Sequence, residues 1–216
     1  KAPRRPAAWF AMGSSYHGIV EDWENGGRKE HEEQLYELYS ADYKARIEAT
    51  MQEWPDTEIW MTGGSKKGEQ DIADREVLGR WQVGDYVRFA LENEDEWRII
   101  ASEVYFEMDF GGVPVVGYID QVRQYKDGRL EAVDLKTGSS TPVTAVQLAT
   151  YRWAVHKHTG VLPDTGAFVK AGRPATPRSK KDKPTADIRH DLRHWTKDKL
   201  DQWFVAMDWA ERNGVY

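Results

Sequence analysis

The chain has 216 residues, of which 40% are hydrophobic and 31% are charged, and this composition is typical of a globular protein with a substantial core. It contains no cysteine, which excludes disulfides, thiolate zinc sites and cysteine-ligated iron–sulfur clusters and favours a reducing, cytoplasmic compartment. The net charge of −6 by itself argues against a nucleic-acid partner. No apolar run is long enough to span a membrane.

The N-terminal part of the chain predicts three helices, over residues 14–26, 29–54 and 71–91, with a loop over residues 62–70 before the third. Ser14-Ser15 begins the first helix and Gly26-Gly27 closes it. The second helix is acidic and ends before Pro55. The third is expected to be interrupted around Gly79 to Gly84, because glycine disfavours a helix interior.

From Trp97 onward the hydrophobic pattern changes to that of strands, which are predicted over residues 97–110, 113–125, 129–136 and 166–172. A helix is predicted between the last two, with Thr141 as its N-cap, Pro142 at its first position and Gly160 past its end. Residues 173–190 are rich in proline and charge and predict a loop, and residues 195–214 predict a closing amphipathic helix. This order of elements predicts an α/β fold with a central mixed sheet flanked by helices.

The third strand carries an acid and an amine on one face. Side chains alternate along a strand, so Asp134 and Lys136 share a face while Val133 and Leu135 turn toward the core. A buried carboxylate needs a cation or a metal ion near it. For a single pair of this kind, a structural salt bridge is the better interpretation.

A second acid, Asp120, ends an apolar run on the preceding strand. A two-residue Asp127-Gly128 loop would place it opposite Leu135, and the two acids would then face opposite sides. A three-residue loop from Lys126 to Gly128, with its glycine in the left-handed conformation, would place it directly opposite Asp134. We expect the three-residue loop. Two adjacent carboxylates repel each other unless a divalent cation lies between them, and an all-oxygen site suits Mg²⁺ or Mn²⁺.

The next helix supplies two more polar groups. Gln147 and Tyr151 are one helical turn apart and share a face that flanks the apolar stripe. We expect them to reach the pocket at the end of the strands.

Four short motifs occur in order along the chain: "GSSYH", "GYID", "VDLKTG" and "QLATY". Together they resemble the nuclease domain of the RecB family, within the PD-(D/E)xK nuclease superfamily, and an ordered set is far more specific than D-x-K alone. The resemblance implies a restriction-endonuclease-like core. It also implies a single nuclease domain over residues 1–216, with a helical insertion at about residues 28–92 and a basic loop at about residues 171–190.

The resemblance implies a set of metal ligands. Asp120 and Asp134 would bind Mg²⁺ or Mn²⁺ with the backbone carbonyl of Leu135, and His17 would be a further ligand or would hold one. Glu103 on the first strand would add another acid. Two other acids on that strand compete for the assignment: Glu107 and Asp109.

The resemblance also implies the catalytic groups and the reaction. Lys136 would orient or activate the attacking water, and Gln147 and Tyr151 would position the lysine or contact the scissile strand. The implied activity is a metal-dependent DNA nuclease, most simply an exonuclease acting on an end or a single strand in recombination, repair or phage DNA metabolism, with a recombination or replication protein as a partner. CRISPR-associated members of the family bind an iron–sulfur cluster through four cysteines, and this chain has none.

Three other interpretations stay open. One is a dimeric endonuclease of the same fold, and another is a nuclease-fold module that binds DNA without cleaving it. Intact Asp120, Asp134 and Lys136 argue against the loss of catalysis. The third is an unrelated α/β domain with a coincidental salt bridge, which the ordered motifs argue against.

Charge is unevenly distributed along the chain. Residues 21–62 hold twelve acids and four bases, a net charge of −8, whereas residues 170–199 hold ten bases and four acids, a net charge of +6. The basic segment is either a phosphate-binding edge or a solvated loop. Six of its residues are expected to raise DNA affinity without setting sequence preference: Lys170, Arg173, Arg178, Lys180, Lys181 and Lys183.

Overall fold

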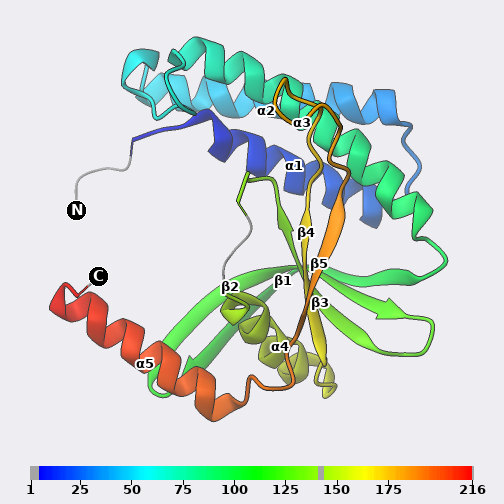
Figure 1. Ribbon diagram of the computed structural model, residues 1–216, viewed down its shortest axis with the longest axis vertical. Coiled ribbons are helices and arrows are strands. Elements are labelled where there is room, and N and C mark those ends of the chain that lie inside the picture. Colours follow the sequence, from blue (N-terminus) through cyan, green and yellow to red (C-terminus); the bar gives the residue numbers. More distant parts are fainter. Residues whose placement is uncertain (1–4, 141–143, 216) are drawn as a thin grey trace. The chain divides into compact units, whose positions relative to one another are not determined.

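The computed structural model describes residues 5–140 and 144–215, and its elements are drawn in Figure 1. Within this part the chain forms two compact units. Unit 1 is built from the residues up to Glu92 together with Lys136–Gly138 and Lys170–Ala186. Unit 2 is built from Asn93–Leu135, Ser139–Val169 and the residues from Asp187 onward.

Unit 1 consists mainly of helices, namely α1 (Ala8–Asn25), α2 (Glu32–Glu53), the short 3₁₀ helix η1 (Thr57–Ile59) and α3 (Gly68–Glu92) (Figure 1). The predicted start of α1 at Ser14-Ser15 is wrong, because the helix begins at Ala8. Its N-cap, Ala7, makes no side-chain cap, but Ala8, Ala11 and Met12 are buried. Burial of this extra apolar stretch outweighs the missing cap.

Helix α3 runs without a break through Gly79 and Gly84, so the predicted interruption is wrong. A Cβ at Gly79 would lie 1.8 Å from the hydroxyl oxygen of Tyr39, and one at Gly84 would lie 2.1 Å from that of Tyr36. Both tyrosines belong to α2. The glycines therefore allow the tyrosines of α2 to approach the backbone of α3, and this packing offsets their poor helix propensity.

Unit 2 contains a five-stranded mixed sheet in the order β1-β2-β3-β4-β5. The strands are β1 (Trp97–Phe110), β2 (Val113–Tyr125), β3 (Leu130–Lys136), β4 (Thr165–Lys170) and β5 (Ala186–Asp191). The first three pair antiparallel as a meander. The predicted α/β fold class is confirmed.

Two helices, α4 (Val146–Thr159) and α5 (Lys197–Asn213), complete unit 2. Helix α4 begins at Val146 with Ala145 as its N-cap, and it ends, as predicted, before Gly160 at a φ of 73°. The predicted cap residues Thr141 and Pro142 lie outside the described residues.

Apolar clusters fasten both helices of unit 2 to the sheet. Helix α4 packs on it through a cluster that includes Ile119, Val122, Ala132, Ala154 and Val155. Helix α5 packs through Leu200 against Phe110 and Ala149. Within the part of the chain that the structure describes, no helix is long and apolar enough to cross a lipid bilayer.

Candidate active site

The turn between β2 and β3 sets the register of the site. Residues Lys126 to Gly128 form the loop, with Gly128 at a φ of 87° and its N–H donating to the carbonyl of Tyr125 at 2.9 Å. The paired residues include Gln121 with Val133 and Arg123 with Glu131. The predicted three-residue loop is therefore confirmed. Continuing the register by one residue places Asp120 opposite Asp134.

Both acids are held by hydrogen bonds. The Oδ2 atom of Asp120 accepts from the backbone N–H of Leu135 at 2.6 Å. Asp134 is buried, and its Oδ1 atom accepts from Nε2 of Gln147 at 2.6 Å and from the hydroxyl of Tyr151 at 3.2 Å. The two helix residues that the motif singled out therefore orient the carboxylate of β3.

Tyr151 is kept in its protonated form by its surroundings. Burial raises the pKa of its hydroxyl above the ordinary value near 10, and the charges of Asp134 and Asp120 raise it further. The phenol therefore donates to Asp134 throughout the neutral pH range.

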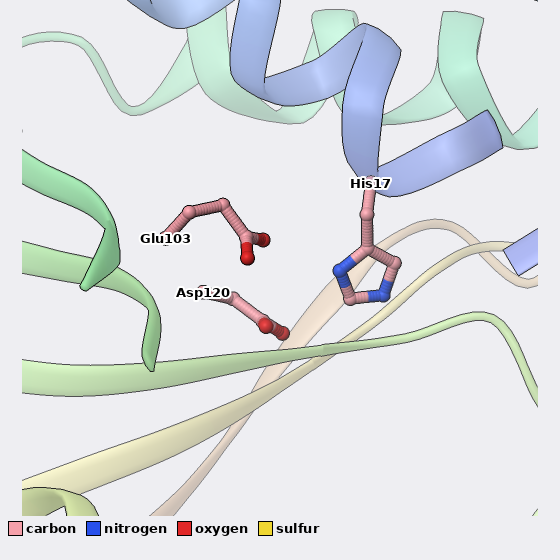
Figure 2. Close-up of side chains that lie close together, drawn as sticks. All are labelled: His17, Glu103 and Asp120. Carbon is pink, nitrogen blue, oxygen red and sulfur yellow. The ribbon is translucent and has the colours of Figure 1, made fainter. Parts of the chain in front are cut away.

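A third acid, Glu103, lies next to Asp120 on the neighbouring strand. Ser102 pairs with Gln121 and Val104 pairs with Ile119, so Glu103 stands opposite Asp120. The two carboxylate groups offer oxygens within 4.8 Å of each other, and Figure 2 shows them turned the same way from their strands. The competing acids Glu107 and Asp109 pair further along, with Val116 and Pro114. We call Glu103, Asp120 and Asp134 the acid row.

Glu103 also has an unusual backbone conformation. Its φ is 46°, in the left-handed region that residues other than glycine rarely adopt inside a strand. Such a conformation costs of order 1 kcal/mol and is concentrated at functional sites. The sequence gives no sign of it, since a positive φ at glutamate has no signature in the hydrophobic pattern.

Lys136 is the last residue of β3 and is half-buried. Strand alternation places its side chain on the same face as that of Asp134. The next carbonyl, that of Thr137, accepts from Nη2 of Arg173 at 2.7 Å and from Nε2 of Gln82 at 3.3 Å. Gln82 belongs to a region without recognisable motifs and lies between the charged residues Arg80 and Asp85, so the sequence does not mark it as buried.

His17, the predicted further ligand, is carried by α1 in unit 1 and is half-buried. Figure 2 draws its imidazole on that helix.

The basic segment is fastened to α3 within unit 1. The backbones of Arg173 and Lys183 bond reciprocally, at 2.6 and 2.7 Å. The carboxylate of Asp85 accepts from the hydroxyl of Thr185 at 2.7 Å, and Gln82 donates to the carbonyl of Gly172 at 3.1 Å. We call residues 173–183 the basic hairpin.

The six predicted phosphate-binding residues fall into two groups. Four are exposed: Arg178, Lys180, Lys181 and Lys183. Arg173 is partly buried and donates to Thr137. Lys170 is also partly buried, and burial and the positive charges of Arg173 and Lys183 lower the pKa of its amine.

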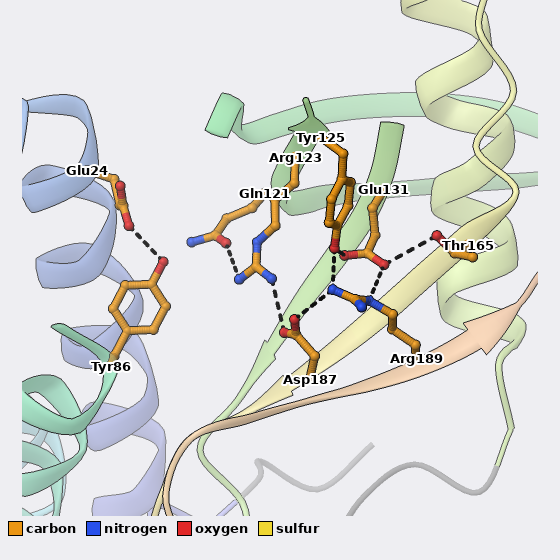
Figure 3. Close-up of polar contacts among 9 residues, drawn as sticks. All are labelled: Glu24, Tyr86, Gln121, Arg123, Tyr125, Glu131, Thr165, Asp187 and Arg189. Carbon is orange, nitrogen blue, oxygen red and sulfur yellow. Dashed lines mark hydrogen bonds and ion pairs between the residues drawn. The ribbon is translucent and has the colours of Figure 1, made fainter. Parts of the chain in front are cut away.

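Part of the predicted loop at residues 173–190 is instead strand β5, so that prediction is wrong over residues 186–190. The charges that suggested a loop are paired with buried charges of the sheet. Asp187 accepts from the fully buried Arg123 at 3.0 Å, and Arg189 donates to the buried Glu131 at 3.0 Å, as Figure 3 shows. A strand whose charges are neutralised in this way lacks the alternating pattern on which sequence prediction depends.

The chain matches known proteins over most of its length. The model of the PD-(D/E)XK nuclease superfamily matches residues 2–213. The "Gene 69 protein" of Mycobacterium phage D29 is 32% identical over 217 residues, which cover 96% of this chain and 78% of the phage protein. The "Gene 69 protein" of Mycobacterium phage L5 is 30% identical over 232 residues, with 94% and 77% covered.

A solved structure described as "Crystal structure of SSO0001" matches 75% of this chain and 70% of its own chain, at 16% identity and a TM-score of 0.29. The family model agrees with the superfamily that the ordered motifs indicate. The chain belongs to the PD-(D/E)XK nuclease superfamily.

Proposed function

We propose that this protein is a metal-dependent DNA nuclease of the RecB type, with residues 1–216 as one nuclease domain that acts as an exonuclease on an end or a single strand. The observation that carries the proposal is the acid row, in which facing positions of β1, β2 and β3 all hold a carboxylate, followed by Lys136 on β3. The phage origin of the relatives supports a role in phage DNA metabolism, recombination or repair beside a recombination or replication protein.

The donor set fits a divalent cation. Oxygens of Glu103 and Asp120 lie within 4.8 Å of each other, a separation that two metal–oxygen bonds of about 2.1–2.4 Å would span. Asp134, the carbonyl of Leu135 and the imidazole of His17 would complete the ligands. Oxygen with one imidazole suits Mg²⁺ or Mn²⁺. A cation bound there would polarise the phosphate as a Lewis acid and lower the pKa of water.

Three side chains would orient the water and the metal-binding carboxylate. Lys136 would orient the attacking water and place a fixed positive charge beside the phosphate, where negative charge builds up during hydrolysis. Gln147 and Tyr151 would keep the carboxylate of Asp134 in one orientation, because both donate to the same oxygen.

The basic hairpin would bind the phosphates of DNA outside the reacting position. Its exposed lysines and arginine carry positive charges, which would attract the phosphates of any sequence equally. Arg173 would act indirectly, since its guanidinium fixes the backbone directly after Lys136.

The test uses end-labelled linear DNA, single-stranded and duplex, beside closed circular DNA, each with Mg²⁺, Mn²⁺ or EDTA. An exonuclease releases label from linear DNA with either metal, leaves the closed circle intact and does nothing in EDTA. Nicking of the circle would replace the exonuclease with an endonuclease. Binding without any cleavage would leave only a DNA-binding module.

A further inference from the structure

Unit 2 contains an apolar pocket of about 440 Å³ beside the helix that carries the motif residues. It lies between α4, β2 and α5. Its lining includes Phe106, Val116, Gln147, Tyr151, Trp203 and Phe204. Its volume is in the range of small-molecule binding sites.

The aromatic walls of the pocket are held in place by other rings. Phe106 meets Tyr151 edge-on, with ring centroids 5.9 Å apart. Trp203 meets Phe204 edge-on at 5.0 Å, and Phe204 in turn stacks on Phe110, also at 5.0 Å. Rings that are already fixed lose little conformational entropy when a flat ligand stacks on them.

The pocket adjoins the acid row through two shared side chains. Gln147 and Tyr151 line it, and both donate to Oδ1 of Asp134. Among the lining residues that the structure describes, no aspartate or glutamate occurs, so the walls do not repel an anionic ligand. An occupant of the pocket would therefore contact the two side chains that donate to Asp134.

We propose that the pocket takes an unpaired nucleobase next to the scissile phosphate, which makes single-stranded DNA the preferred substrate. This inference rests on the proposed nuclease function. A base has the flat, apolar faces that aromatic walls bind, and it is covalently tied to the phosphate that the acid row would act on. A base in a duplex is stacked and paired, so it cannot enter unless it is flipped out or frayed.

A pocket-filling substitution tests the proposal. Val115 lines the pocket, is only partly buried and lies on the same strand face as Gly117, where a Cβ would meet the ring of Phe106, so Val115→Trp fills the space. The matched control is Val161→Trp, at a residue that is 48% exposed between α4 and β4 and does not line the pocket. A second variant, Phe204→Leu, removes a ring while keeping an apolar wall.

The probe is a single-stranded octanucleotide with 2-aminopurine at its end, titrated in EDTA so that no cleavage occurs. The wild type and Val161→Trp should quench the fluorescence of the end base, because stacking quenches it. Val115→Trp and Phe204→Leu should lose the quenching and bind the strand about tenfold more weakly. A blunt duplex should bind all four proteins equally.

The outcomes separate this inference from the proposed function. Equal quenching and affinity in Val115→Trp and the wild type would overturn the pocket assignment, and so would a wild type that binds the strand without quenching. A wild type that never cleaves DNA with Mg²⁺ or Mn²⁺ would overturn the nuclease function, while the fluorescence titration would still decide whether the pocket binds a base.

Discussion

Glu103 and Asp120 bring two carboxylates within 4.8 Å of each other in a half-buried setting, where like charges repel strongly. Their strands could have avoided this repulsion with a neutral residue at either position. The same arrangement becomes favourable when a divalent cation is shared between them. We therefore propose that the left-handed backbone at Glu103 and the two close carboxylates belong to one cation site.

Replacing one acid should change metal affinity and stability in opposite ways. In EDTA, Asp120→Asn should be more stable than the wild type, because it relieves repulsion while its side-chain oxygen can still accept from Leu135. Calorimetry should show at least about tenfold weaker Mn²⁺ binding, for this variant and for Asp134→Asn.

The control for this experiment is Asp127→Asn, which changes an exposed acid of the hairpin loop by the same chemistry. Its Mn²⁺ affinity should equal that of the wild type. Unchanged affinity in both Asp120→Asn and Asp134→Asn would remove these residues from the metal site.

At the scale of elements, the close contact between α2 and α3 leads us to expect a stability change opposite to the one that helix propensity predicts. Gly79→Ala should destabilise the protein by at least about 1 kcal/mol, although alanine favours helices. The new methyl group would meet the hydroxyl of Tyr39. That ring is fully buried and stacked on Tyr43 at 5.9 Å, so it cannot move aside freely.

Gly18→Ala in α1 is the matched control, because a Cβ there has nothing within 4 Å. It should stabilise the protein by about 0.5–1 kcal/mol. Denaturant unfolding gives both values. If Gly79→Ala also stabilised the protein, the close packing of α2 on α3 would be refuted.

The buried tyrosines of α2 predict a loss of stability at alkaline pH. Burial raises the pKa of Tyr39 and of Tyr43 above the ordinary value near 10. In the unfolded chain these phenols ionise near pH 10, while in the folded protein they stay neutral. Their contribution is therefore complete below about pH 10 and is lost as the pH rises further.

Unfolding free energies from about pH 8 to about pH 11 check this prediction. The value should fall above about pH 10, and Tyr39→Phe should make the fall less steep. A free energy that stays constant over this range would contradict the burial of these hydroxyls.

The helices and strands that could be predicted well are those determined by residues close to them in the sequence. The strands at residues 97–110 and 113–125 follow from alternation and from Gly111-Gly112 between them, and the register of Asp120 follows from the loop before Arg129. The others depend on distant partners. The continuity of α3 requires the tyrosines of α2, and β5 requires the buried charges Arg123 and Glu131.

The residues of the candidate site also fall into those that nearby sequence indicates and those that only the fold brings together. Asp120, Asp134 and Lys136 could be found because they lie in short motifs, and Gln147 and Tyr151 could be found because they share a helix face. No motif separates Glu103 from its competitors Glu107 and Asp109, because the place of Glu103 beside Asp120 depends on strand pairing. Gln82 and Asp85 lie outside every motif, and only the fold shows that they anchor the basic segment.

At the scale of the whole molecule, a chain with a net charge of −6 presents a basic hairpin with exposed cations. Replacing Lys180, Lys181 and Lys183 by glutamine should make the slope of log affinity for single-stranded DNA against log salt shallower by about two. Sequence preference should not change.

The control replaces Lys29, Lys44 and Lys67, three exposed lysines elsewhere in unit 1, and makes the same change in net charge. Its slope should match the wild type. A slope that responds equally to both triple variants would mean that net charge, and not the basic hairpin, determines DNA affinity.

We propose that β3 turns an acid, Asp134, and an amine, Lys136, to one face for the hydrolysis of DNA. Lys136→Ala tests it most directly, with Lys126→Ala, an exposed lysine of the hairpin loop, as the control. Melting temperature and Mg²⁺-dependent hydrolysis of end-labelled DNA are measured side by side. Lys136→Ala should have the melting temperature of the wild type. It should cleave DNA about 10²–10³-fold more slowly, because one preorganised charge is lost beside the reacting phosphate. Lys126→Ala should match the wild type in both. If Lys136→Ala has a lower melting temperature than the wild type, and the wild type never cleaves DNA, then Asp134 and Lys136 form only a structural salt bridge.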